Sequence, residues 1–163
     1  MRLAAQLMTI CCLATSALAQ PARQLEVVLL LEGDCTKMRA PSVDLTADCK
    51  GKLTRDTFSD RRTGFTFFVS GPGKDPVALT FTGMATGQVS QDGGVTVQPI
   101  DGLIMSIGNR PINGRAVGAC RYGDPFKPSG FVDCIAEVSE GQFEGKFQQN
   151  ATAPMVIRGQ SRK

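Results

Sequence analysis

The chain has 163 residues, with 18 lysines and arginines against 15 aspartates and glutamates, and it contains no histidine. Without imidazole, serine–histidine and cysteine–histidine nucleophiles and most zinc sites are excluded. The formal net charge of +3 is too small to indicate binding to nucleic acid or to an anionic membrane surface.

Residues 1–19 indicate a cleaved signal peptide. Arg2 gives a positively charged start, residues 3–18 are almost wholly apolar or small, and Ala17 and Ala19 fit the positions that a signal peptidase recognises. The apolar run is shorter than the roughly 20 residues of a membrane-spanning helix. We therefore expect cleavage after Ala19, no transmembrane anchor, and a periplasmic or secreted product formed by one domain, residues 20–163.

Four cysteines follow, and they repeat one spacing. Cys35 and Cys49 lie fourteen positions apart, and so do Cys120 and Cys134. In an exported chain this pattern is typical of disulfides, and the repeat favours Cys35–Cys49 with Cys120–Cys134 over the two other connectivities. The rival interpretation, a metal site, would need histidine or short Cys-x-x-Cys clusters, so we expect no metal.

Apolar and polar residues alternate with a period of two in many short runs, which predicts strands and no sustained helix. In chain order, the expected strands cover residues 29–35, 43–53, 65–69, 77–82, 95–97, 103–107, 116–120, 132–138, 142–147 and 155–158. Turn residues separate many of these runs, at positions 71–73, 92–94, 101–102, 108–111 and 113–114.

About nine or ten short strands predict an all-β fold, either a single antiparallel β-sandwich or a small β-barrel. Two similar units, at about residues 24–70 and 109–150, would each hold one disulfide and share one core. The alternation places the cysteines on inward faces of paired or adjacent strands. Gly33 and Gly118, two positions before the first cysteine of each pair, would make room for a ring or a sulfur, or mark a bulge.

Asp48 and Asp133 each precede the second cysteine of a pair. Strand alternation turns such residues outward, beside an inward cysteine. A symmetric pair of ligands or catalytic bases is the functional alternative.

The segment 121–128 is the main candidate for recognition. It combines the only tyrosine of the chain with a phenylalanine between prolines and several charges. The candidate binding residues are Arg121, Tyr122, Asp124, Phe126 and Lys127. Tyrosine and arginine dominate the hot spots of protein interfaces, and the expected Cys120–Cys134 bridge tethers the base of this loop. The alternative is that Tyr122 and Phe126 fold back as a lid over the core.

Arg61 and Arg62 lie in a charged connection between two strands. Its mixed charges are typical of a solvated hairpin. Binding of an anion or of an acidic partner is the functional alternative for these two arginines.

In size, compartment and β-content the chain is similar to the membrane-bound or periplasmic inhibitors of c-type lysozyme. That family carries a Ser-Gly-x-x-Tyr motif, whereas Ser70 and Gly71 are followed here by Pro72, Gly73 and Lys74, without a tyrosine. The resemblance therefore implies a class of protein and carries no site residue across.

We expect an exported, non-enzymatic β-domain that acts as a binding or interaction module, one form of which is an inhibitor of a host or envelope hydrolase. The partner would be a protein or an envelope glycan, and we expect no cofactor. Two alternatives stay open. One is a histidine-free hydrolase that uses paired carboxylates, and the other is a purely structural component of the envelope.

Overall fold

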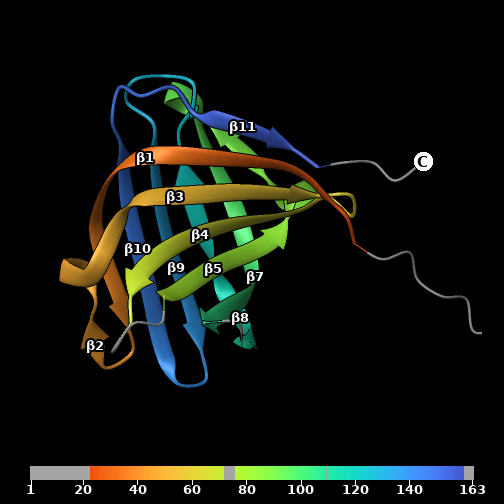
Figure 1. Cartoon of the computed structure of the whole chain (residues 1–163). Coiled ribbons are helices and arrows are strands. Elements are labelled where there is room, and N and C mark those ends of the chain that lie inside the picture. Colours follow the sequence, from red (N-terminus) through yellow and green to blue (C-terminus); the bar gives the residue numbers. More distant parts are fainter. Residues whose placement is uncertain (1–22, 72–75, 109, 160–163) are drawn as a thin grey trace, which may run out of the picture.

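The computed structural model describes residues 23–71, 76–108 and 110–159, so the predicted signal peptide, residues 1–19, lies outside the described residues. The described chain is all-β, with three single-turn 3₁₀ helices (Figure 1). Its strands are β1 (Leu25–Ala40), β2 (Val43–Asp44), β3 (Cys49–Phe58), β4 (Arg62–Ser70), β5 (Pro76–Met84), β6 (Val89–Gln91), β7 (Val95–Ile107), β8 (Arg110–Tyr122), β9 (Phe131–Val138), β10 (Gly141–Gln149) and β11 (Met155–Arg158). The short helices are η1 (Thr46–Asp48), η2 (Ala85–Gly87) and η3 (Asp92–Gly94).

Eight of the strands close into an antiparallel barrel. Of the two folds that the sequence predicts, the structure is therefore the barrel and not the sandwich. The order is β1-β3-β4-β5-β7-β8-β9-β10, and β10 pairs back onto β1. Figure 1 shows β3, β4 and β5 in front and β8, β9 and β10 behind them. The remaining strands are additions, because β2 and β11 pair with β1 and β6 pairs with β7. In the described residues, no helix is long and apolar enough to cross a membrane.

Strand β1 closes the barrel because it pairs with different neighbours along its length. Its first part pairs with β3 up to Glu32, and its last part pairs with β10 from Gly33 onward. The register against β10 shifts between Cys35 and Lys37. This bulge inverts the side-chain alternation, so Leu31 before it and Met38 after it are both buried in the core.

The barrel interior is a packed aliphatic and aromatic core. Its fully buried rings and large aliphatic side chains include Phe65, Phe67, Phe81, Phe147, Met38 and Leu53. Phe67 and Phe81 meet edge to face, with ring centroids 5.8 Å apart. Gly145 makes room for this pair, because a Cβ at that position would lie 2.8 Å from the Phe67 ring.

Both expected disulfides are present, and the predicted pairing is confirmed. Cys120 and Cys134 are direct partners across β8 and β9, and both are fully buried. Cys35 of β1 bonds to Cys49, the first residue of β3, with their Cα atoms 5.8 Å apart. Each bridge therefore joins neighbouring strands of the barrel.

Gly33 and Gly118 are required by the backbone of a neighbouring strand. A Cβ on Gly33 would lie 2.1 Å from the carbonyl oxygen of Gln148, and one on Gly118 would lie 2.0 Å from that of Ile135. The expected ring or sulfur is thus replaced by a main-chain contact. The duplication of residues 24–70 and 109–150 stays a prediction, because similar disulfides and glycines do not establish a repeat.

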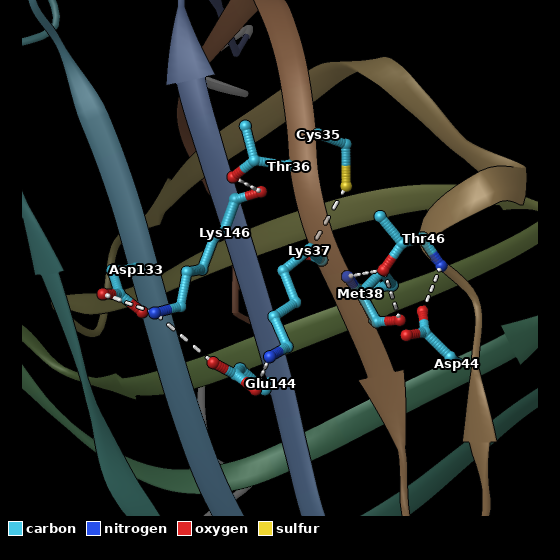
Figure 2. A network of polar contacts seen from close by, with 9 residues as sticks. All are labelled: Cys35, Thr36, Lys37, Met38, Asp44, Thr46, Asp133, Glu144 and Lys146. Atoms are coloured by element: carbon cyan, nitrogen blue, oxygen red, sulfur yellow. Dashed lines mark hydrogen bonds and ion pairs between the residues drawn. The ribbon is translucent and has the colours of Figure 1, made fainter.

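The expected strand over residues 43–53 is wrong in its first half. β2 ends at Asp44, whose carboxylate accepts a hydrogen bond from the Thr46 amide at 2.9 Å, and the η1 turn follows (Figure 2). Such a bond favours a turn over a strand. Asp48 therefore lies in η1, whereas Asp133 lies in β9.

Two expected turns also lie inside strands. Gly102 is in β7 and Gly114 is in β8, whereas the turn between these strands follows Ile107, where the expected turn at 108–111 begins. Gly108 adopts the left-handed φ of 56° that such a turn requires. The turn at 92–94 is present as η3, while residues 72 and 73 of the expected turn at 71–73 lie outside the described residues.

Candidate functional site

Tyr122 is the last residue of β8 and belongs to the core. It is 6% exposed, and its ring centroid lies 5.0 Å from that of Phe65. From β3, the Arg55 guanidinium lies 4.7 Å from the centroid of the Tyr122 ring and donates a hydrogen bond to its hydroxyl at 3.3 Å. For this residue the lid interpretation holds.

Phe126 behaves in the opposite way, since 62% of it is exposed. It lies in the loop of residues 123–130, which joins β8 to β9. The Asp124 carboxylate accepts a hydrogen bond from the Phe126 amide at 3.0 Å, and the Asp124 carbonyl accepts one from the Lys127 amide at 3.1 Å. A second turn follows, in which the Gly130 amide donates to the Lys127 carbonyl at 3.1 Å. The backbone around Phe126 is thus fixed by local turns.

The end of β10 ties this loop to the barrel. The Gln149 side chain donates to the Pro125 carbonyl at 2.8 Å, and its main-chain amide donates to the Gly130 carbonyl at 2.8 Å. The Gln148 side chain donates to the same Gly130 carbonyl at 3.1 Å. At the base of the loop, the Gly123 amide donates to the Phe131 carbonyl at 3.1 Å. The loop is therefore held at its base and along its length.

Little free space lies between the loop and the core. The cavity there measures about 10 Å³ and is lined mainly by aromatic, proline and glycine residues, together with Arg55 and Gln149. Such a volume is near the minimum for one water molecule. This end of the barrel is closed by packing, and Phe126 lies on the exposed side of the loop.

Sequence reasoning missed Arg55, Gln148 and Gln149. The alternation of the sequence carried a signal for two of them, Arg55 and Gln149. Arg55 lies two positions after the buried Leu53, and Gln149 lies two positions after the buried Phe147, so each continues an inward face.

The other candidate residues of this segment are exposed. Arg121 lies opposite Asp133 in the β8–β9 register, and Asp124 and Lys127 are exposed on the loop. Opposite charges directly across two strands are mildly stabilising. Arg121 therefore faces an acidic residue across the two strands, whereas Lys127 directly follows Phe126 in the loop.

Asp133 belongs to a charged network on the outer face of β9, β10 and β1 (Figure 2). Lys146 lies 3.6 Å from the Asp133 carboxylate and 3.4 Å from that of Glu144, which also lies 3.4 Å from Lys37. Asp133 and Glu144 together raise the pKa of Lys146. The outward direction predicted for Asp133 is confirmed, and its immediate partner is a lysine.

Arg61 and Arg62 lie at the β3–β4 turn. Arg61 is exposed and adopts a left-handed φ of 64°. Arg62 donates to the Asp101 carboxylate from both terminal guanidinium nitrogens, and the Nη2 contact measures 3.0 Å. The hydrogen bonds between these two side chains raise the pKa of Arg62 and lower the pKa of Asp101. No hydrogen bond or ion pair joins either arginine to the loop 123–130 within the described residues.

No metal-binding cluster of three or more histidines, cysteines, aspartates or glutamates occurs in the part of the chain that the structure describes. Comparison of the chain with protein-family models, with curated proteins and with solved structures finds no match.

Proposed function

We propose that this chain is an exported binding protein that inserts Phe126 of the loop 123–130 into a cleft of a partner protein. The observation that carries this proposal is an aromatic side chain 62% exposed on a loop whose backbone is hydrogen-bonded at its base and along its length. Exposed aromatic residues that become buried on association are frequent hot spots. A loop that is already ordered loses less conformational entropy when it binds.

Location outside the cytoplasm agrees with this role. The two disulfides indicate an oxidising compartment. Cleavage after Ala19 and release into the periplasm or the medium belong to the proposal, because residues 1–22 lie outside the described residues.

The shape and chemistry of the loop favour a protein cleft as the target. Phe126 is apolar, and Lys127 beside it offers a positive charge that an acidic rim would attract. A hydrolase has such a cleft at its active site, so inhibition of a host or envelope hydrolase is the form of binding that we propose. Binding rather than catalysis also agrees with the absence of histidine from the chain.

The test uses the mature wild-type protein, a Phe126→Ala variant and a Val117→Ala control, assayed for binding to and inhibition of c-type lysozyme and a panel of secreted proteases. Val117 is a matched control, since it is 78% exposed and lies on β8 outside the loop. Loss of a hot-spot aromatic weakens binding by about 2 kcal/mol or more, roughly 30-fold. We expect this loss for Phe126→Ala alone, with thermal midpoints equal to that of the wild type. The proposal fails if the wild type inhibits none of these enzymes, or if both variants bind as well as it does.

A further inference from the structure

The wall of the barrel opens where β8 parts from β9. The two strands pair from Val117 with Glu137 to Tyr122 with Val132. The first seven residues of β8, Arg110–Ala116, pair with β7 or lie beside its bulge, and no described strand pairs with their other edge. β9 ends at Val138, and the chain turns into β10.

A hollow of about 510 Å³ lies at this opening. Its apolar lining comes from three sides, with Leu103 and Met105 on β7, Ile112 on β8, and Val138 and Phe143 on the β9–β10 hairpin. The volume falls in the range of roughly 300–1,000 Å³ typical of small-molecule sites, and barrel mouths are a common place for them. The cavity at the closed end of the same barrel measures only about 10 Å³.

The lining is arranged as an apolar floor with a more exposed wall. Leu103 and Phe143 are buried, whereas Ile112 is 56% exposed although it faces the hollow. Covering such a side chain with an apolar molecule removes hydrocarbon surface from water, at about 25 cal/mol per Å². An apolar body is therefore the part of a ligand that this hollow would bind.

The rim is polar and carries both signs of charge. It is formed by Asn113, Arg115, Ser139 and Glu140. The Ser139 hydroxyl donates to the Glu140 carboxylate at 2.6 Å and lowers the pKa of Glu140, so this group is ionised at neutral pH. A charged ligand end would be attracted by one of Arg115 and Glu140 and repelled by the other. An uncharged group that donates and accepts hydrogen bonds meets no such repulsion.

We propose that this hollow binds a small uncharged amphiphile, with its apolar body between Leu103, Ile112 and Phe143 and its hydrogen-bonding end at the rim. The site lies at the β8–β9 opening, and none of its lining residues belongs to the loop 123–130.

Gly114 provides a direct way to block the site. It lines the hollow, and a Cβ there would meet only the Leu103 carbonyl oxygen, at 3.9 Å. A leucine at position 114 therefore extends into the hollow without a backbone clash. Val117→Leu is the matched control, since it adds side-chain volume to the same strand at an exposed position outside the site.

The probe is N-phenyl-1-naphthylamine, an uncharged aromatic amine whose fluorescence rises in apolar surroundings. We expect saturable binding to the wild type with one site per chain, at least about tenfold weaker binding to Gly114→Leu, and unchanged binding to Val117→Leu. Decan-1-ol should displace the probe at lower concentration than decanoate. Thermal unfolding and near-ultraviolet circular dichroism verify that each variant is folded.

Three results would overturn the proposal. The first is absence of saturable probe binding to the folded wild type. The second is equal affinity of Gly114→Leu and the wild type. Displacement by decanoate at or below the concentration of decan-1-ol is the third, because it would contradict the uncharged end of the ligand. None of these results bears on hydrolase inhibition through Phe126, so the two proposals fail separately.

Discussion

Arg55 of β3 donates a hydrogen bond to the Tyr122 hydroxyl of β8 at 3.3 Å, and its guanidinium lies 4.7 Å from the centroid of the Tyr122 ring. β3 and β8 are not neighbours in the barrel, so this contact crosses the interior. It places a cation among aromatic rings directly below the loop 123–130. The closed end of the barrel therefore contains a polar contact between two strands that are not neighbours in the sheet.

We expect Arg55→Ala to destabilise the fold by about 1–3 kcal/mol, because it removes the stacked cation and leaves the buried Tyr122 hydroxyl without its donor. Tyr122→Phe keeps the ring and should cost about 0.5–1.5 kcal/mol. Urea unfolding measures both changes. The double variant tests their coupling, and strictly additive losses would contradict a direct interaction.

Gly145→Ala should destabilise the barrel by about 1–3 kcal/mol, as expected for overpacking. The new Cβ would lie 2.8 Å from the Phe67 ring. Phe67→Leu in the same chain should recover part of this loss, since the smaller side chain leaves room for the methyl group. Gly114→Ala is the control, because its Cβ finds its nearest neighbour at 3.9 Å. A Gly145→Ala protein as stable as the control would show that the ring can move away without cost.

Replacing either pair of cysteines by alanine should lower the free energy of unfolding by about 3 kcal/mol, since both bridges close loops of similar length. The sequence separation is 14 in each case. Denaturant unfolding of the two double variants measures the losses. Peptide mapping of the non-reduced wild type should recover only Cys35–Cys49 and Cys120–Cys134, and a bridge between the two pairs would contradict the fold.

Two aspartates should give opposite pH dependences of stability. Burial raises the pKa of Asp56 above its ordinary value of 3.8, against the lowering effect of hydrogen bonds from Thr54 and Thr66. The folded state then holds this proton more tightly than the unfolded chain does. The contribution of the Asp56 carboxyl to the free energy of unfolding is complete below its pKa in the unfolded chain. It is lost as the pH rises through its pKa in the folded protein. Asp101 is the reverse case, because Arg62 lowers its pKa and the contribution is lost as pH falls.

Asp56→Asn should therefore be more stable than the wild type at pH 7, and Asp101→Asn should be less stable. Both differences should shrink as the pH falls to about 3. Asp56 then approaches its neutral form in the folded protein, and Asp101 takes up a proton more readily in the unfolded chain than beside Arg62. Urea unfolding at the two pH values measures them. Equal differences at both pH values would show that the effects do not come from ionisation.

The alternation of apolar and polar residues predicted much of the barrel, because its strands have one solvent-exposed face and one buried face. Phe65, Phe67 and Val69 share an inward face, as expected from their spacing. Closure was not predictable in this way, because it depends on pairing of Gly33 with Gln149, residues distant in the sequence. The bulge after Cys35 also turns Met38 into the core, whereas a simple period of two continued from Leu31 would place it on the outer face.

The candidate site also has one part that alternation predicts and one part that tertiary contacts determine. The inward position of Tyr122 follows from the alternation through Cys120, two residues earlier. The exposure of Phe126 does not follow from its neighbours in sequence, because the loop is held by the side chains of Gln148 and Gln149 from another strand. The composition of the segment was enough to select it as a candidate. Its tertiary contacts decide that Tyr122 is buried and Phe126 is exposed.

The central claim is that the free protein already holds Phe126 in a fixed, exposed position. Backbone ¹⁵N relaxation of the mature wild-type protein tests this most directly. We expect the amide of Phe126 to show an order parameter of about 0.85, equal to that of the barrel strands. A value below about 0.6 would describe a flexible loop and would contradict the claim.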